Sequence, residues 1–507
     1  MHCPQTSQPF FPANIKLKAM EINIAILYIN FLALLALSFA TMILNKRLRL
    51  TKRTVPSLPP GPMGYPIIGC FPKMMKNKPA FRWIHRLMQE INTEIACIRL
   101  GNAYVIPVTS PKLAREFLKK HDVIFASRPD ALSAKLTSNG YLTTVFSSYG
   151  DQWKKMTRVI ASEVLSPAMH RWLYGKRCEE VDHMMRYVYN QCQSPITEGL
   201  VNVRVVAQHY CGNLTRKLIF SKRFFGTGME DGGPGMEEKE HLHGIFTILK
   251  YVYGLGIADY LPWLEVFDLD GHKTILKDAI RSVRKYQDPE INKREIMLAA
   301  VDNPSNAVDW ALAEMINQPD ILHRACQELD EVVGRDRLVD ESDLSKLNYV
   351  KACIKEAFRL HPMVPFNVPH VSSKDTIVGG YFIPKGSQVL LSRLGLGRNP
   401  RIWEDPLVYK PERHIGNKDL EVMLVDHELR MLSFSTGRRG CPGIVLGSTM
   451  TTILLARLIQ GFNWTAPPNG PSNVDLTESE GEMVKATPLI AHVVPRLEPH
   501  VYLKLMS

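Results

Sequence analysis

The sequence has few cysteines, and they are not arranged in pairs or clusters. Nine are scattered through 507 residues, their number is odd, and none forms a Cys-x-x-Cys pair. A disulfide framework is therefore not expected, and the chain is predicted to face a reducing, cytosol-side compartment.

Internal repeats, low-complexity tracts and a linker in the middle of the chain are also absent. Length alone would suggest about three domains of ~150 residues each. Since 45% of the residues are hydrophobic, the chain can bury a large core. We expect one large globular unit.

Signatures of nucleic-acid binding are missing as well. The sequence has no zinc-finger, recognition-helix or aromatic-basic pattern, so no nucleic-acid partner is expected. Lys and Arg number 62 against 50 Asp and Glu, which gives a net charge of +12. A solvated surface with a basic membrane flank explains this excess, and a specific acidic partner protein is the alternative.

Charged residues are absent from 22–44, near the N-terminus. As a helix this run would be about 34 Å long, enough to cross a bilayer. We predict a transmembrane anchor at 20–45, preceded by an N-terminal extension at 1–19. A cleaved signal peptide is the weaker alternative, because the run is long and no small-residue cleavage site follows. Met20 is a candidate alternative start.

A basic and proline-rich segment at 46–66 follows the predicted anchor. More basic residues follow the apolar run than precede it, which predicts that the C-terminal bulk faces the cytosol. The prolines predict a stiff hinge. They are Pro59, Pro60, Pro62 and Pro66.

The remaining body, 67–507, is predicted to be mainly α with small β sheets. Alternation at 94–100 and 103–109 around Gly101-Asn102 predicts a hairpin. Residues 376–378 and 388–391 flank a glycine- and proline-rich turn region and predict a second strand pair. Helical periodicity covers most of the rest. The predicted helices are 111–120, 152–164, 295–317, 320–333, 349–360 and 443–460.

Residues 434–443 form a short loop around Cys441, with the sequence Phe-Ser-Thr-Gly-Arg-Arg-Gly-Cys-Pro-Gly. Gly437 and Gly440 allow the backbone to turn tightly and approach a flat cofactor. Pro442 is predicted to start a helix, where its missing N–H costs nothing. Cys441 would then lie at the positive end of that helix, which favours the thiolate over the thiol.

This stretch resembles the cysteine signature of the cytochrome P-450 superfamily, Phe-x-x-Gly-x-Arg-x-Cys-x-Gly, and every fixed position matches. The resemblance implies a cytochrome P-450 fold behind the N-terminal helix. It implies that Cys441 is the axial ligand of the iron of haem b. Arg439 would pair with a haem propionate, Phe434 would cover the sulfur, and Gly437 would admit the cofactor.

The same resemblance implies a membrane-bound monooxygenase. Such an enzyme uses O2 and electrons that an NADPH-dependent reductase supplies. It would lie in the endoplasmic reticulum membrane as a single-pass protein, with its catalytic domain facing the cytosol.

Further motifs match the superfamily. Glu356 and Arg359 are three residues apart and share a helix face. With Arg413 of the motif Pro-Glu-Arg-His they resemble the family's buried structural triad. Trp153 resembles a tryptophan that contacts a propionate, although Thr157 stands where the family usually has arginine. His370 resembles a residue that reaches a propionate, and a simple loop histidine is the alternative.

The predicted helix 295–317 carries Asp302, Asn303 and Pro304 where most superfamily monooxygenases have an acid followed by threonine. Pro304 has no N–H, so a kink and a free carbonyl at Ala300 are expected. A proline kink without a chemical role is the alternative.

The Asn-Pro pair resembles the aldoxime-forming plant amino-acid N-monooxygenases. That resemblance implies two N-hydroxylations of an α-amino acid, then dehydration and loss of CO2, as in glucosinolate or cyanogenic glucoside formation. A buried apolar pocket would lower the pKa of the amine and expose its lone pair. The sequence reveals neither the amino acid nor the residue that binds its carboxylate.

One segment departs from the family. Residues 286–289 run almost directly into 290–291 and the alanine-rich helix, where the family has several tens of additional residues. A catalytically impaired haem protein is therefore kept as one alternative. The replaced threonine permits a second, a haem-thiolate rearranging enzyme that needs neither oxygen nor reductase. Asp302 and the Asn-Pro pair argue against the second.

Overall fold

The computed structural model describes residues 56–506, except for 224, 227, 253, 288–293 and 417–419. Near the N-terminus it also describes residues 26, 28–31, 33–34, 36–38 and 40–41. The chain divides into two units, Met1–Ser57 and Leu58–Ser507. The predicted extension at 1–19, the alternative start at Met20 and the basic residues at 46–53 lie outside the described residues. The described part of the predicted anchor at 20–45 is helical.

Within the described residues, one helix is long and apolar enough to cross a membrane. It is α17 (Ile444–Gly461), and 72% of it is buried inside the protein. A helix that is apolar around most of its surface and buried on most sides belongs to a core.

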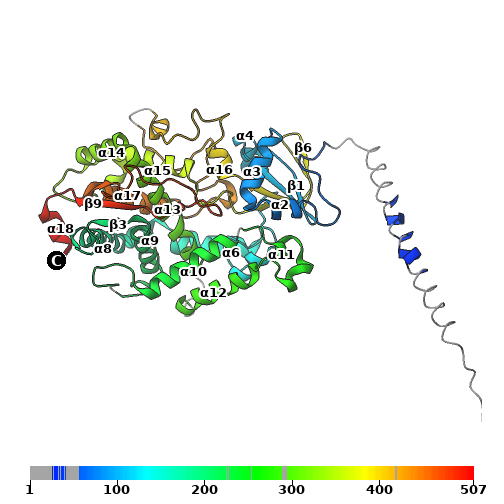
Figure 1. Cartoon of the computed structure of the whole chain (residues 1–507), viewed down its shortest axis with the longest axis horizontal. Coiled ribbons are helices and arrows are strands. Elements are labelled where there is room, and N and C mark those ends of the chain that lie inside the picture. Colours follow the sequence, from blue (N-terminus) through cyan, green and yellow to red (C-terminus); the bar gives the residue numbers. More distant parts are fainter. Residues whose placement is uncertain are drawn as a thin grey trace, which may run out of the picture. The chain divides into compact units, whose positions relative to one another are not determined.

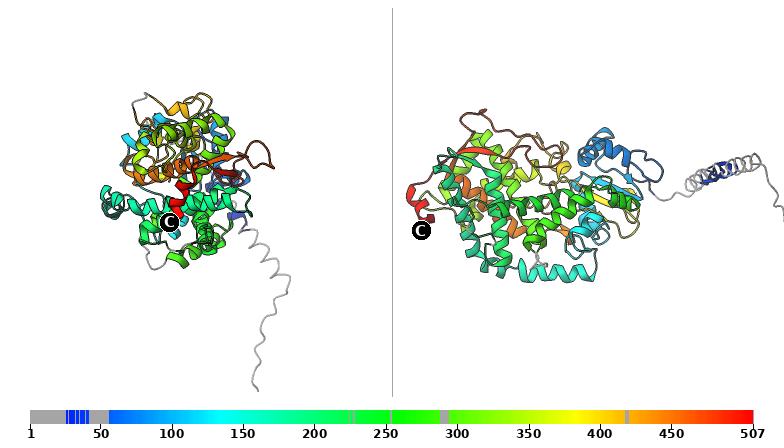
Figure 2. Two further views of the ribbon diagram at one scale, coloured as in Figure 1. Left: turned by 90° about the vertical axis from the view of Figure 1, so that its left-hand side faces the viewer. Right: turned by 60° about the horizontal axis from the view of Figure 1, so that its bottom comes forward.

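The second unit is built around a bundle of four helices, which are labelled in its left-hand half in Figure 1. They are α8 (Tyr174–Gln193), α9 (Val203–Phe220), α13 (Arg294–Asn317) and α17. α13 packs against α9 on one side and against α17 and α15 (Asn348–Leu360) on the other. The C-terminal helix α18 (Pro499–Met506) lies against α8 (Figure 2). The largest hydrophobic core fills the space between these helices.

Shorter helices surround the bundle. The predicted helix 111–120 is present as α4 (Pro111–Arg115) with a wider final turn, η1 (Glu116–Lys120). The predicted helix 152–164 is present as α6 (Asp151–Val159) followed by η2 (Ile160–Val164). The others are α2 (Phe71–Lys76), α3 (Ala80–Glu90), α5 (Leu132–Thr137), α7 (Pro167–Trp172), α10 (Met236–Val252), α11 (Ile257–Tyr260), η3 (Pro262–Phe267), α12 (His272–Gln287), α14 (Pro319–Val332), η5 (Glu341–Lys346), α16 (Arg393–Gly397), η6 (Pro411–His414) and η7 (Gly437–Arg439).

Within the described part of the chain, three small sheets accompany the helices. The first has the order β1-β2-β7-β4, from β1 (Ile98–Leu100), β2 (Ala103–Val108), β7 (Gln388–Leu391) and β4 (His370–Val371). The second has the order β3-β9-β8, from β3 (Leu200–Asn202), β9 (Ile490–Pro495) and β8 (Phe462–Thr465). The third pairs β5 (Thr376–Val378) with β6 (Tyr381–Ile383). The predicted hairpin around Gly101-Asn102 is β1-β2.

The predicted pairing of 376–378 with 388–391 is wrong. β5 pairs with β6, because Gly379 and Gly380, with φ of 57° and 82°, close a tight turn directly after Val378. Positive φ at two successive central positions is the geometry that returns a strand on itself, and glycine adopts it readily. A second turn ends at Gly386 and sends β7 to the first sheet, where it runs parallel to β2.

The proline-rich part of the predicted hinge lies on this unit. The Cys97 N–H donates to the Pro60 carbonyl at 2.8 Å. A Cβ on Gly61 would come within 1.8 Å of the Cys97 carbonyl oxygen. Only glycine permits that approach of the two backbones.

An ion cluster around the fully buried Glu356 connects α15 to the segment before the cysteine loop. Glu356 accepts hydrogen bonds from Arg359 at 2.7 Å and Arg413 at 2.9 Å, and it contacts His414 at 2.7 Å. Burial by itself raises the pKa of Glu356, but the hydrogen bonds of Arg359 and His414 outweigh it and lower the pKa to about 2. The predicted triad is therefore present, with Arg359 and Arg413 both bound to the Glu356 carboxylate.

This cluster makes the free energy of unfolding depend on pH in the acidic range. Glu356 ionises below its ordinary pKa of about 4.5, so its stabilisation is present above that pH and is lost as the pH falls toward 2. We expect Glu356→Gln to lower the free energy of unfolding by roughly 3 kcal/mol at pH 7, because the fully buried Arg359 and the largely buried Arg413 lose their partner. Urea unfolding followed by circular dichroism measures this loss.

The difference between the Glu356→Gln variant and the unmodified protein should shrink between pH 4.5 and 2. Glu428→Gln is the matched control, since Glu428 pairs with Arg430 while its side chain is 69% exposed. It should change the free energy of unfolding by no more than about 0.5 kcal/mol. Equal losses in the two variants would contradict the assignment.

Candidate active site

Cys441 lies between η7 and α17, in a loop that its own backbone closes. Its N–H donates to the Phe434 carbonyl at 2.8 Å, and the Gly440 N–H donates to the Gly437 carbonyl at 3.0 Å. Burial raises the pKa of the Cys441 thiol, while the Gly443 N–H and the charge of Arg393 oppose that rise. The side chain is nevertheless exposed. A thiol that is surrounded by protein and still accessible faces an internal opening.

The prediction that Pro442 starts the following helix is wrong. α17 begins at Ile444 with Gly443 as its N-cap. Pro442 and Gly443 form the turn that leads into the helix. The positive end of α17 still acts on the sulfur, through the Gly443 N–H.

Gly437 fixes the position of the loop. Its φ is +74°, and a Cβ there would lie 2.4 Å from the carbonyl oxygen of Leu118 in η1. The next residue is held to the same region, because Asp122 accepts the Arg438 N–H at 3.1 Å and pairs with its side chain at 3.1 Å. These contacts hold the cysteine loop against the end of η1.

Phe434 supports the loop from the other side. Its ring packs edge-on to Phe358, with centroids 5.9 Å apart, and lies against Gly447 of α17. Its carbonyl accepts the Cys441 N–H. Phe434 thus joins the cysteine loop to α15 and α17.

Arg439, Trp153 and His370 meet in one corner beside the loop. The Arg439 guanidinium donates to the carbonyls of Ala126, Thr144 and Ser147 at 2.6–2.8 Å and lies 4.6 Å from the Trp153 ring centre. His370 is buried and its Nδ1 lies 2.8 Å from the Phe125 carbonyl. Burial, then Arg128, lowers the pKa of His370 to about 3, and Arg439 adds to this.

Asp302, Asn303 and Pro304 lie in the middle of α13, which runs through Pro304 without interruption. Asp302 is buried, and burial followed by the nearby charge of Glu482 raises its pKa to about 7, while Arg204 acts in the opposite direction. The Ser305 hydroxyl donates to the Val301 carbonyl at 2.8 Å, which satisfies one carbonyl of this turn.

A cavity of about 830 Å³ borders this part of α13. Its wall includes Asp302, Ser305 and Asn306 of α13, and Cys441 does not line it. Its apolar surface comes from distant parts of the chain: Phe81, Leu242, Phe246, Leu249, Phe366, Leu390 and Met483. Three of its polar residues were not predicted: Arg204 of α9, Asn306 and Glu482. For Asn306 a signal existed, because it lies three residues after Asn303 on one helix.

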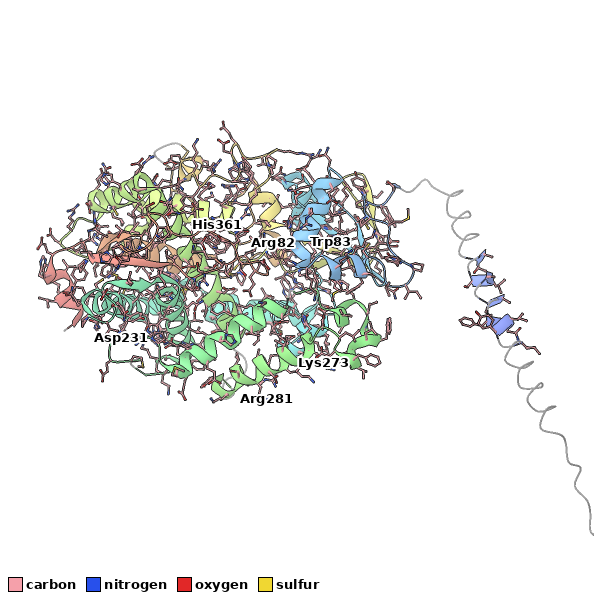
Figure 3. All side chains as sticks on the ribbon, viewed as in Figure 1. Arg82, Trp83, Asp231, Lys273, Arg281 and His361 are labelled. Carbon is pink, nitrogen blue, oxygen red and sulfur yellow. The ribbon has the colours of Figure 1, made fainter. Side chains whose placement is uncertain are left out.

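Residues 480–484 form the tip of a small hairpin that lines the cavity. Its base, a bridge between Glu478 and Lys485, is clamped by Arg398 and by Arg82 of α3. Arg82 also donates to the Ser479 and Glu480 carbonyls at 2.9 and 3.2 Å. His361, labelled with Arg82 in Figure 3, lies 3.8 Å from the Glu478 carboxylate. The clamp fixes the tip against α13.

Comparison with known proteins identifies the family. A sequence model described as Cytochrome P450 matches residues 59–295 and 285–493. The chain belongs to the cytochrome P450 family. It is therefore a monooxygenase that uses haem b, O2 and electrons that NADPH supplies through a reductase.

Several relatives of this P450 are similar over most of their length. A phenylalanine N-monooxygenase of Prunus mume is 52% identical in an alignment of 490 positions, which covers 88% of this chain and 92% of the relative. An isoleucine N-monooxygenase of Lotus japonicus is 50% identical over 93% of this chain and 96% of its own. A tryptophan N-monooxygenase of Prunus mume is 50% identical, with 89% and 93% covered.

The residues around Cys441 fit the haem of a P450. Arg128 and Arg439 concentrate positive charge in this corner, and the neutral His370 adds a polar ring nitrogen, so the corner suits the carboxylates of the propionates. Three hydroxyls are buried without a hydrogen-bond partner among the described residues: those of Ser433 and Ser435 at the loop, and that of Thr157, one turn after Trp153 on α6. Buried polar atoms without partners are expected where a bound group belongs.

The pinned loop yields a test. We expect Gly437→Ala to lower the haem content per polypeptide several-fold, because the left-handed backbone costs about 1 kcal/mol or more and the new Cβ meets the Leu118 carbonyl. Haem per mole of purified chain is the measurement. Gly175→Ala is the control, since its Cβ would meet nothing within 4 Å. Unchanged haem content in Gly437→Ala would contradict this account of the loop.

Proposed function

We propose that this P450 hydroxylates the nitrogen of an α-amino acid and yields the corresponding aldoxime. The observation that carries the proposal is the similarity of about 50%, over most of both chains, to relatives named N-monooxygenases of phenylalanine, isoleucine and tryptophan. Two N-hydroxylations followed by dehydration and loss of CO2 give the aldoxime. Such products lie in glucosinolate or cyanogenic glucoside metabolism.

In this proposal Cys441 supplies the thiolate that binds the haem iron. The Gly443 N–H and the charge of Arg393 favour the thiolate. Trp153, Arg439 and His370 hold the propionate corner, Phe434 shields the sulfur side, and Gly437 keeps the loop close to η1. Haem held by these residues would activate O2, which is the source of the oxygen atom that enters the substrate nitrogen.

Asp302, Asn303 and Pro304 would act on the oxygen side. The raised pKa of Asp302, about 7, lets it hold or release a proton near neutral pH. Asn303 takes the place of the usual threonine as a polar group. Pro304 withholds an N–H from the Ala300 carbonyl, which leaves that oxygen free to accept a hydrogen bond.

We propose a single-pass anchor in the endoplasmic reticulum membrane, with the catalytic unit in the cytosol. The uncharged run 22–44 and the basic residues after it support this topology. The NADPH-dependent reductase of that membrane would be the partner.

A second candidate is a catalytically impaired haem protein. Only 288–293 separate α12 from α13, and the two stretches that match the family model meet at 285–295. The 490-position alignment uses 88% of 507 residues, about 446, so roughly 44 of its positions have no counterpart here. Loss of such a segment beside the cavity would weaken substrate packing. The rearranging enzyme is disfavoured, because Asp302 retains the proton-handling acid.

One experiment separates these functions. The full chain is expressed in membranes with reductase and NADPH, the reduced carbon monoxide spectrum is recorded, and a panel of amino acids is supplied. We expect a haem-thiolate spectrum, its loss in Cys441→Ser, and an oxime from at least one amino acid. The matched comparison is a chain in which 288–293 is replaced by the longer segment of a relative.

Each outcome has a meaning. A thiolate spectrum with oxime only from the lengthened chain identifies the impaired protein. No oxime from either chain rejects the amino-acid proposal. A missing thiolate spectrum rejects Cys441 as the ligand.

A further inference from the structure

One face of α13 carries a polar row along the cavity. Asp302, Asn306 and Asp309 follow each other at spacings of four and three residues, so they lie on one side of the helix. Asp302 and Asn306 line the cavity. Asp309 is fully buried behind them and binds Arg204. Asn303, about 60° from Asn306 around the helix, borders this face.

Asn306 is the first sign that a ligand belongs there. Its side chain is only 6% exposed, yet its Nδ2 has no hydrogen-bond partner among the described residues. Leaving a buried amide donor without an acceptor costs about 1–3 kcal/mol. The wall of the cavity is therefore incomplete without an acceptor from a bound molecule.

Arg204 is the second sign. Its Nε and Nη2 donate to one carboxylate oxygen of Asp309, at 3.2 and 3.0 Å, and Nη2 also donates to the Lys485 carbonyl at 3.0 Å. Within the described part of the chain its Nη1 makes no hydrogen bond, and the residue lines the cavity. Asp309 thus orients a guanidinium whose remaining nitrogen is available to an anion.

The acidic side of the cavity lies at Asp302, one turn of α13 before Asn306. The Asp302 carboxylate accepts no hydrogen bond from the described residues, and Glu482 at the hairpin tip is close enough to raise the Asp302 pKa. Glu482 also pairs with Lys250 of α10 at 3.4 Å, across the cavity. Asp302 and Asn306 are separated by about 6 Å along the helix axis.

We infer that this face of α13 binds the zwitterionic part of the amino acid. Arg204 Nη1 and Asn306 Nδ2 receive the substrate carboxylate, and Asp302, with Glu482 beside it, receives the ammonium group. The inference rests on the proposed function and deepens it, because it names the residues that make a free amino acid, and not an amine, the substrate.

The other cations of the cavity wall suit this role less. Lys78, Lys239 and Lys250 are exposed, and Lys250 already pairs with Glu482. Exposed ammonium groups bind anions weakly, because water and salt screen them. Arg204 is half-buried and held in place by Asp309.

The arrangement also places the reacting nitrogen. An ammonium group has no lone pair, so it must lose a proton before an oxygen atom can enter. Asp302 accepts that proton from the substrate nitrogen and becomes a neutral acid, and the freed amine lies next to Asn303. The burial of Asp302 makes its neutral form accessible near pH 7.

Ligand binding to the full haem-loaded chain tests the inference. Amino acids are compared with the amines that lack only the carboxylate: L-phenylalanine with 2-phenylethylamine, and L-isoleucine with 2-methylbutylamine. Dissociation constants come from the shift of the haem absorption band on titration. We expect Arg204→Gln to raise the Kd for the amino acid at least tenfold and to change that for the amine by less than about twofold.

Asn306→Ala should show the same selective pattern with a smaller effect, and it preserves the Arg204–Asp309 pair if Arg204→Gln fails to fold. Arg204→Lys should recover part of the affinity for the amino acid. Lys239→Gln, an exposed lysine of the same wall, is the control and should leave both constants within about twofold.

Equal losses for amino acid and amine in Arg204→Gln and Asn306→Ala would assign both residues a structural role and overturn the inference. Unchanged constants in both variants would overturn it too. Absence of amino-acid binding and oxime formation in the unmodified and the lengthened chain would instead reject the proposed function itself. The two failures are therefore distinguishable.

Discussion

The burial of α13 is the constraint on which the rest of the structure depends. The helix is enclosed by α9, α15 and α17, yet its described turns carry Asp302, Asn306, Asp309 and Glu314 at buried positions. Burying polar groups without partners is costly, so the surrounding elements must supply partners. Arg204 of α9 meets Asp309, and His361 at the end of α15 lies 2.7 Å from Glu314.

Trp310 extends the same constraint to the hairpin. Its ring stacks on His361 with centroids 3.8 Å apart, and its Nε1 donates to the Met483 carbonyl at 3.2 Å. The buried residues of α13 thus hold α9 through Arg204, the end of α15 through His361, and the hairpin of the cavity wall through Met483. Asp302 and Asn306, whose carboxylate and amide nitrogen have no hydrogen-bond partner among the described residues, both line the cavity.

Local sequence patterns predicted most turns and helices, because these elements depend mainly on the backbone preferences and spacing of neighbouring residues. Gly437 signals a left-handed turn, and the periodicity of 349–360 signals a helix whichever neighbours it meets. The partner of β5 was missed, since two turns compete within ten residues and only the sheet decides which strand returns. Arg204 and Glu482 were missed because 98 and 180 residues separate them from Asp302, and one sequence contains no signal for such a contact.

The substrate side depends less on the connection before α13 than its short length suggests. α10, which forms part of the cavity wall, is held to α9 by buried hydrogen bonds. Glu238 accepts from Asn213 at 3.0 Å and from Arg216 at 3.1 Å, and it lies 2.9 Å from His209. Breaking such a buried network costs several kcal/mol, so α10 keeps its place whatever joins α12 to α13. The polar row of α13 would therefore serve what all amino acids share, while the apolar walls around Phe81, Phe246 and Phe366 select the side chain.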